Sequence, residues 1–277
     1  MRQDELLFAS DLDNTLLFSH KHAQAGDVCV EHLDGKAQGF FTPKVIRGLE
    51  EINRTMRFAP VTSRSVAQFL RIQFPAGCVP HLALAANGGL LLRDGGIDEA
   101  WQAASLRCVA PWRAELARAA ALLAQVPIPL RARMVDDLYL FAACDSPAEA
   151  EAALTAVQGK IHLTAELSGR KLYFFPPGLS KGDALRRLRA LLTPQRVLCA
   201  GDSGIDVPML AAADVALVPR KGMVEGGVVW DGAGRFSEFV VEMVSGFARA
   251  FPEGEGGPAK PGRMRATSQA AVRRVKR

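Results

Sequence analysis

The 277-residue sequence predicts an α/β protein in which a doubly wound parallel-sheet core is interrupted by an inserted α+β module. Short apolar runs alternate with amphipathic runs of helix length towards both ends of the chain, a pattern typical of parallel βαβ units. Between residues 91 and 177 the pattern changes to a helix followed by two strands, and it occurs twice. Such a repeat favours an antiparallel sheet covered by helices on one face.

The first core segment, residues 1–90, opens with an apolar strand at Glu5–Ser10. Asp27–Phe41 alternates loosely around Asp34-Gly35, which predicts a β-hairpin with a tight turn. A helix follows at Thr42–Met56, with Thr as its N-cap and Pro at its first position. The remaining elements expected here are a strand at Arg57–Val61, a helix near Ser65–Phe74 and a strand at His81–Ala86.

The inserted module, residues 91–177, and the second core segment, residues 178–251, follow the same rules. In the module we expect helices at Ala110–Val126 and Pro147–Gln158, with strands at Leu130–Val135, Leu138–Ala143, Ile161–Leu167 and Lys171–Phe175. In the second core segment we expect helices at Lys181–Leu192, Val207–Ala212 and Phe236–Phe251, with strands at Val197–Ala200 and Val215–Val218.

The net charge of +5 is concentrated in the last residues of the chain. From Phe251 onward there are seven Lys or Arg and two Glu, so this tail alone carries +5 and the remainder is close to neutral. The tail, residues 252–277, is rich in Gly, Pro, Lys and Arg and lacks periodicity, which predicts disorder. A charge confined to a tail argues against nucleic-acid binding by a folded face.

Cysteine usage and hydropathy indicate an intracellular protein. The five cysteines are scattered and form no C-x-x-C pair, which argues against a disulfide framework or a zinc site and favours a reducing cytoplasm. No run of about twenty apolar residues occurs, so we expect no membrane span.

Two pairs of aspartates follow predicted strands. Asp11 and Asp13 come directly after the first strand, and Asp202 and Asp206 follow Val197–Ala200 in a glycine-rich turn. Ligands bind beyond the carboxyl ends of strands in open α/β sheets, where such carboxylates can share one Mg²⁺. Taken singly, the first pair also suits a surface loop, and Asp206 also suits a helix N-cap.

Two further strand-end segments carry groups suited to phosphate. Thr62-Ser63-Arg64 offers hydroxyls and amides at a helix start, although simple N-capping would explain the hydroxyls equally well. Lys181 opens a helix against the helix dipole, which a bound anion near the ammonium would justify. Carboxylates, a hydroxyl and a lysine at one sheet edge are the groups that phosphoryl transfer through a covalent carboxylate requires.

These four segments, in this order, resemble the haloacid dehalogenase superfamily, with its Rossmann-like core. The segments DLDNTLL and GDSGIDVPML carry most of the likeness, which extends over about Leu6 to Phe251. The position of the insert resembles the members with an α+β (C2B-type) cap, such as Cof-type sugar phosphatases and sucrose-phosphate phosphatases. The resemblance implies a magnesium-dependent phosphatase with a cap over its active site.

The resemblance also implies roles for individual residues. Asp11 would be the nucleophile, Asp13 the general acid and base, and Thr62 and Lys181 would hold the phosphoryl oxygens. Asp11, Asp13, Asp202 and Asp206 would form or support the Mg²⁺ site. Substrate contacts would come from Ser63, Arg64, Asn87 and Arg170, while Asn87 also suits a hinge-side turn and the arginines also suit solvated surface positions.

Two positions depart from the family pattern. Ile205 stands where the family has Asn before the last Asp, and an apolar side chain cannot donate a hydrogen bond there. Ser63 stands in place of the usual Gly. The resemblance implies hydrolysis of a phosphate monoester, with a sugar phosphate or similar small metabolite as the substrate. A phosphomutase and a non-catalytic binding protein on the same scaffold are the alternatives, and the sequence indicates no oligomeric state.

Overall fold

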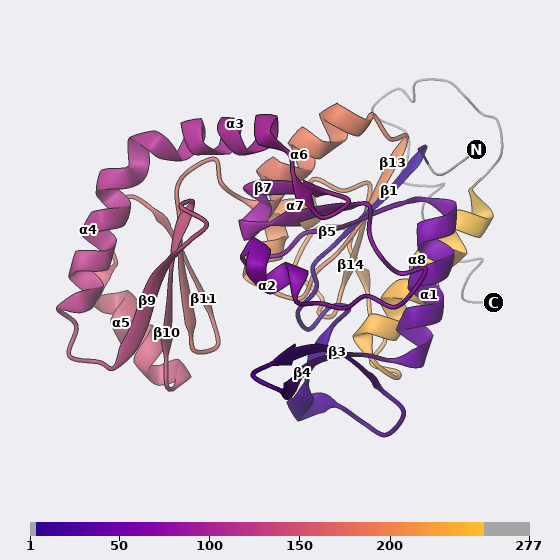
Figure 1. Cartoon of the computed structure of the whole chain (residues 1–277), viewed down its shortest axis with the longest axis horizontal. Helices are drawn as coiled ribbons and strands as arrows, with labels where there is room; N and C mark the ends of the chain where they lie inside the picture. The colour runs from indigo at the N-terminus through magenta and orange to yellow at the C-terminus, as the bar shows by residue number, and fades with distance from the viewer. Residues whose placement is uncertain (1–3, 252–277) are drawn as a thin grey trace.

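The computed structural model describes residues 4–251 and has a five-stranded parallel sheet at the centre of its core (Figure 1). The strand order is β15-β14-β13-β1-β5, and all neighbouring strands run parallel. The strands are β1 (Leu6–Ser10), β5 (Arg57–Pro60), β13 (Arg196–Ala200), β14 (Val215–Val218) and β15 (Val228–Val229). The predicted α/β fold class is thus confirmed.

Helices cover both faces of this sheet, because its central strand is apolar at nearly every position. Leu6 and Phe8 of β1 pack towards α1 and α8, whereas Leu7 and Ala9 pack towards α6 and α7. Figure 1 shows the two helix pairs on opposite sides of the sheet. The helices are α1 (Pro43–Thr55), α6 (Lys181–Leu192), α7 (Val207–Ala211) and α8 (Phe236–Ala250), with a 3₁₀ turn, η4 (Gly204–Asp206), before α7.

One edge of the core sheet differs from the prediction. The strand expected at His81–Ala86 is β6 (Leu82–Ala85), which touches the core sheet through a single bridge between Val61 and Leu84. Two strands that the sequence did not reveal, β7 (Leu90–Arg93) and β8 (Gly96–Ile97), continue antiparallel from it. The turn between β6 and β7 is a 3₁₀ helix, η2 (Ala86–Gly88).

The helix expected at Ser65–Phe74 was predicted too long. The structure has only α2 (Val66–Leu70), which begins with a capping box on Ser65. Beyond it, the amide of Gln73 donates to the carbonyl of Val30 in the neighbouring hairpin. A tertiary hydrogen bond thus replaces continuation of the helix.

The predicted hairpin is confirmed as β3 (Val28–Leu33) and β4 (Lys36–Phe41). Its turn has positive φ at Asp34 and Gly35, as a two-residue hairpin turn requires. A short strand, β2 (Phe18–Ser19), adds to β4, and a 3₁₀ turn, η1 (His20–His22), follows it. The hairpin lies beside the end of the sheet that carries Asp11.

The inserted module is an antiparallel sheet in the order β11-β12-β10-β9, with α4 and α5 on one face (Figure 1). Its elements are α4 (Arg113–Ala124), β9 (Leu130–Val135), β10 (Tyr139–Cys144), α5 (Pro147–Val157), β11 (Thr164–Ser168) and β12 (Lys171–Phe175). The predicted α+β module is confirmed, and we call it the cap. A division of the chain at residues 91 and 177 stays a prediction.

A helix that the sequence did not reveal connects the core to the cap. It is α3 (Glu99–Val109), which runs into a 3₁₀ turn, η3 (Ala110–Trp112). Trp101 near its start donates to the carbonyl of Gly88 and stacks on the guanidinium of Arg187 from α6, 3.8 Å from the ring centroid. The start of α3 is therefore fastened to the core.

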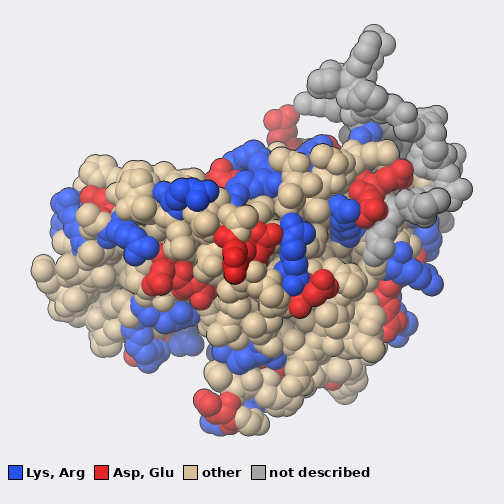
Figure 2. Space-filling model, turned by 45° about the horizontal axis from the view of Figure 1, so that its top comes forward, with Lys and Arg blue, Asp and Glu red and all other residues tan. Residues whose placement is uncertain are grey.

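The surface charge and the hydropathy of the helices agree with the sequence predictions within the residues that the structure describes. Figure 2 shows Lys and Arg interspersed with Asp and Glu, without a continuous patch of one sign on the visible face. No helix within residues 4–251 combines the length and apolarity that crossing a membrane needs. The disorder expected for residues 252–277 lies outside the described residues, and the cytoplasmic location stays a prediction.

Candidate active site

A buried ion cluster lies at the carboxyl end of the core sheet. Asp11 follows β1, Lys181 is the first residue of α6, and Asp206 ends η4. The ammonium of Lys181 lies 2.5 Å from Oδ1 of Asp11 and 2.6 Å from Oδ1 of Asp206. Lys181 is 2% exposed, so three elements distant in sequence converge on one buried cation.

Negative charge exceeds positive charge in this cluster. Burial, followed by repulsion from neighbouring carboxylates, raises the pKa of Asp11 despite the attraction of Lys181. Burial and the charge of Asp206 raise the pKa of Asp202 to about 6. Burial acts to lower the pKa of Lys181, but Asp11 and Asp206 outweigh it and hold that pKa above its ordinary value. One ammonium does not neutralise three carboxylates.

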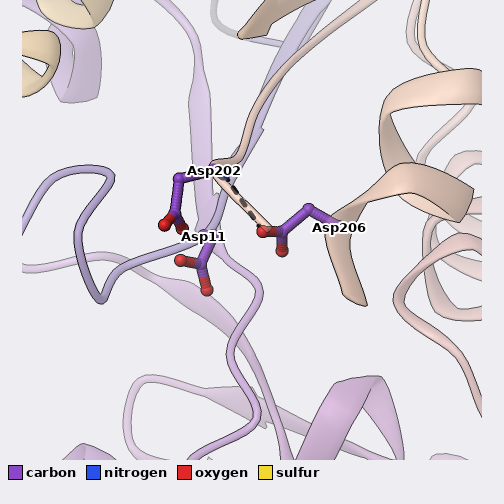
Figure 3. A group of neighbouring side chains, drawn as sticks. All are labelled: Asp11, Asp202 and Asp206. Atoms are coloured by element: carbon purple, nitrogen blue, oxygen red, sulfur yellow. Dashed lines mark hydrogen bonds between the residues drawn. The ribbon is translucent and has the colours of Figure 1, made fainter. Parts of the chain in front are cut away.

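The three carboxylates fit a hard dication. Figure 3 shows Asp11 and Asp202 pointing towards each other, with Asp206 beside them. One oxygen from each of the three lies within 4.8 Å of the others. Both charge and oxygen donors therefore suit Mg²⁺.

Asp206 differs from the other two carboxylates because both its oxygens are engaged. Its Oδ1 accepts from Lys181, and its Oδ2 accepts from the amides of Asp202 and Ser203 and from the Ser203 hydroxyl, at 2.8 to 3.1 Å. Among residues 4–251, the Asp202 carboxylate accepts one side-chain hydrogen bond, from the Thr15 hydroxyl at 3.3 Å. Asp206 thus fixes the loop, while Asp202 stays available as a ligand.

Arg64 binds Asp13 at the edge of the cluster. Its Nε and Nη2 donate to the two carboxylate oxygens of Asp13, each at 2.8 Å. Burial acts to raise the pKa of Asp13, but these hydrogen bonds outweigh it and, with the charges of Lys171 and Lys181, lower that pKa. Asp13 is therefore held as the anion.

Glu31 of the hairpin anchors Arg64, and no sequence pattern indicated this role. Its carboxylate is 2% exposed and lies 2.9 Å from Arg64 Nη1 and 3.1 Å from Arg71 Nη2. A β-bulge at Glu31 breaks the strand alternation, so that Val30 and Glu31 are both buried. Strict alternation would have placed Glu31 in solvent.

Gly39 provides the room for Glu31 on the opposing strand. A Cβ atom at position 39 would lie 3.1 Å from Oε2 of Glu31 and 3.2 Å from its Cβ. Any larger residue would press on the buried carboxylate. The hairpin is therefore shaped around this charge.

A cavity of about 290 Å³ lies between this cluster and the cap. Six residues expected at the site line it: Asp11, Asp13, Ser63, Arg64, Lys181 and Asp202. Four others do not line it: Thr62, Asn87, Arg170 and Asp206. The cap contributes Arg133, Tyr139, Phe141, Ser168, Lys171 and Tyr173.

The residues outside the lining have structural contacts. Thr62 is fully buried, and its hydroxyl accepts from the amide of Arg64 at 3.1 Å. Asn87 has positive φ and donates to the carbonyl of Leu179 at 3.4 Å, beside the chain's return from the cap. Arg170 lies in the turn between β11 and β12, and its carbonyl accepts a hydrogen bond from the amide of Cys144 at the end of β10.

Ile205, the departure noted in the sequence, faces the cavity. It is 8% exposed and packs with the apolar cluster of the cap. Its side chain thus joins core to cap where the family's Asn would offer a hydrogen bond.

Three hydrogen bonds, which we call the latch, join the cap to residues 63–68 of the core. The hydroxyl of Tyr139 donates to the carbonyl of Ser63, the amide of Val66 donates to Asp136 at 3.0 Å, and Arg133 donates to the Gln68 side chain at 3.3 Å. The latch holds the cap over the cavity.

No family model matches the sequence, and a search of curated proteins found no match either. Solved structures do resemble the chain. Sucrose-phosphatase from Synechocystis, in complex with sucrose and phosphate, is 20% identical, covers 79% of this chain and 83% of its own, and has a TM-score of 0.55. The C-terminal domain of trehalose-6-phosphate phosphatase from C. albicans is 14% identical, with 88% and 93% covered and a TM-score of 0.54.

A Thermoplasma acidophilum protein gives a similar result, with 12% identity, 86% and 95% covered and a TM-score of 0.54. At such identities the comparisons establish the fold alone. The shared fold is a parallel α/β core with an inserted α+β module, as the sequence predicted.

Proposed function

We propose that this protein is a phosphatase that hydrolyses a phosphate monoester of a small metabolite, with Mg²⁺ as cofactor and Asp11 as nucleophile. The observation that carries the proposal is the convergence of Asp11, Lys181 and Asp202 at one sheet edge, facing a cavity that the cap covers. A sugar as the leaving group is supported by two proteins of the same fold, the sucrose-phosphatase and the trehalose-6-phosphate phosphatase.

The first step would be attack of an Asp11 carboxylate oxygen on phosphorus. The phosphorus–ester oxygen bond breaks, and the leaving alkoxide takes a proton from Asp13. Lys181 would hold a phosphoryl oxygen and offset the repulsion between two anions. Mg²⁺, bound by Asp11, Asp202 and the backbone carbonyl of Asp13, would neutralise charge on the phosphate.

The second step would be attack of water on the aspartyl-phosphate. Asp13 would accept the water proton, and the bond between phosphorus and Asp11 would break. The two hydrogen bonds that Arg64 donates to the carboxylate hold Asp13 as the anion that this step needs. Proton donation in the first step requires Arg64 to release one of the two oxygens and Asp13 to take up a proton from solvent there before the attack; the leaving alkoxide then receives that proton.

Phosphate release from p-nitrophenyl phosphate and a sugar-phosphate panel tests the proposal. Wild type should release phosphate with Mg²⁺ and without any added bisphosphate, which a phosphomutase would need. Asp11→Asn should lower kcat by about 10⁴-fold or more, and chelation of Mg²⁺ should abolish turnover. Asp94→Asn, at an exposed turn outside the cavity, is the matched control.

The alternative of a non-catalytic protein predicts a different result. If folded wild type with Mg²⁺ releases no phosphate from any ester but still binds inorganic phosphate, the chain is a binding protein on this scaffold.

A further inference from the structure

The cap wall of the cavity carries two cations, Arg133 and Lys171, that form no salt bridge with a carboxylate within residues 4–251. In the cap sheet, Arg133 of β9 lies opposite Phe141 of β10, which in turn lies opposite Tyr173 of β12. Two residues further along β10, Ala143 lies opposite Lys171 of β12. All these side chains share one face of the sheet, because side chains two apart point the same way. The other face packs against α4 and α5, so this face is the one that meets the cavity.

Charge is unevenly divided between the two walls. Every carboxylate that lines the cavity comes from the core: Asp11, Asp13, Glu31 and Asp202. The core also supplies the cations that pair with Asp11, Asp13 and Glu31, namely Arg64, Arg71 and Lys181. The cap supplies Arg133 and Lys171 and no acid.

These two cap cations form no ion pair with any residue between 4 and 251. Arg133 donates to a neutral amide oxygen and lies 5.2 Å above the Phe141 ring. Arg131, by contrast, lies on the same sheet face as Arg133, pairs with Asp145 at 3.6 Å and does not line the cavity. The unpaired charge thus coincides with the cavity lining.

We propose that Arg133 and Lys171 bind a second anionic group, a carboxylate or a phosphate, on the leaving group of the substrate. This proposal rests on the proposed function, which places the transferred phosphate at Asp11 and so turns the leaving group to the cap. The substrate class is then a small metabolite phosphate that bears an additional acid, within a cavity of about 290 Å³.

A matched substrate pair tests it. The compounds 3-phosphoglycerate and glycerol 3-phosphate differ only in a carboxylate that replaces a hydroxymethyl group on the leaving group. Wild type should favour the former in kcat/KM by about tenfold or more, as a hydrogen bond to a charged group allows. Lys171→Met should lower this preference about tenfold, and the double variant with Arg133→Met should abolish it.

Arg131→Met is the control, since it removes a cation from the same sheet face but outside the cavity. It should leave the preference within about threefold of wild type. An equal kcat/KM of wild type for both esters, or a preference that survives in the double variant, would overturn the proposal.

A binding measurement separates this proposal from the proposed function. Calorimetry of Asp11→Asn with Mg²⁺ and each compound reads the preference without turnover. If this variant prefers 3-phosphoglycerate while wild type hydrolyses no ester, the anion site stands and the phosphatase proposal fails. Hydrolysis of p-nitrophenyl phosphate without any preference in either assay leaves the phosphatase and refutes the anion site.

Discussion

The two walls of the cavity are built on different principles. The core wall consists of charged groups at strand ends, most of them held by a charged partner, as Lys181 is by Asp11 and Asp206. The cap wall is one face of an antiparallel sheet, with aromatic rings and two unpaired cations. Charged groups held in place by buried partners suit a fixed reaction, whereas an open sheet face suits the choice of a substrate. Under the proposed function, the core wall would carry the chemistry and the cap wall would select the substrate.

The most disruptive way to break the core wall is Lys181→Met. It leaves Asp11 and Asp206 buried without their cation, which should lower the free energy of unfolding by about 3–5 kcal/mol. Buried carboxylates without a cation take up protons, so the loss should be smaller in mildly acidic buffer than at neutral pH. Thermal unfolding with and without Mg²⁺ measures it, and Mg²⁺ should restore part of the stability.

Lys21→Met, on the exposed turn after β2, provides the comparison for this variant. If Lys181→Met unfolds at the same temperature as wild type in the absence of Mg²⁺, the cluster of Asp11 and Asp206 carries no excess negative charge.

A smaller effect should follow from Glu31→Gln, which acts on the support of the core wall. Gln can accept one hydrogen bond but leaves Arg64 and Arg71 without their shared anion. The free energy of unfolding should fall by about 1–3 kcal/mol. Because Arg64 then loses its anchor, kcat/KM should fall as well, by about tenfold.

Chemical denaturation and steady-state kinetics measure both quantities, with Lys36→Gln on the same hairpin as the control. Unchanged kinetics in Glu31→Gln would mean that Arg64 does not depend on the hairpin.

The mildest change, Tyr139→Phe, separates the two walls. It removes the hydroxyl that donates to Ser63 but keeps the ring against Phe175, 4.8 Å between centroids. The loss of one hydrogen bond, about 1 kcal/mol, should lower kcat/KM a few-fold. Small-angle scattering should show a larger average radius of gyration, since the cap is held less often against the core. An identical radius and identical kinetics would mean that the latch contributes nothing to closure.

The core wall could be predicted in large part from the sequence. The strands that precede Asp11 and Asp202 are short apolar runs, and parallel strands bring their carboxyl ends to one edge. The helix that begins at Lys181 was predicted with the bounds that the structure shows. The prediction therefore also brought Lys181 close to Asp11 and Asp202. Thr62 was placed correctly at a strand end, but its burial depended on the turn that Arg64 makes.

The rest depended on contacts that no local pattern encodes. Glu31 is turned inward by a bulge, and α2 ends early because Gln73 bonds to the hairpin. Lys171 lines the cavity and Arg170 does not, and this difference depends on how the cap packs against the core. Helix α3 was missed because its periodicity is weak and Trp101 packs on the core instead.

The latch has a consequence for how the contact between cap and core can change by mutation. Two of its three core partners are main-chain groups, the carbonyl of Ser63 and the amide of Val66. Replacing the side chains at those positions leaves both groups in place, so the core cannot readily lose its half of these contacts by point mutation. Heritable change in cap closure is therefore expected to arise at Tyr139 and Asp136, on the cap side.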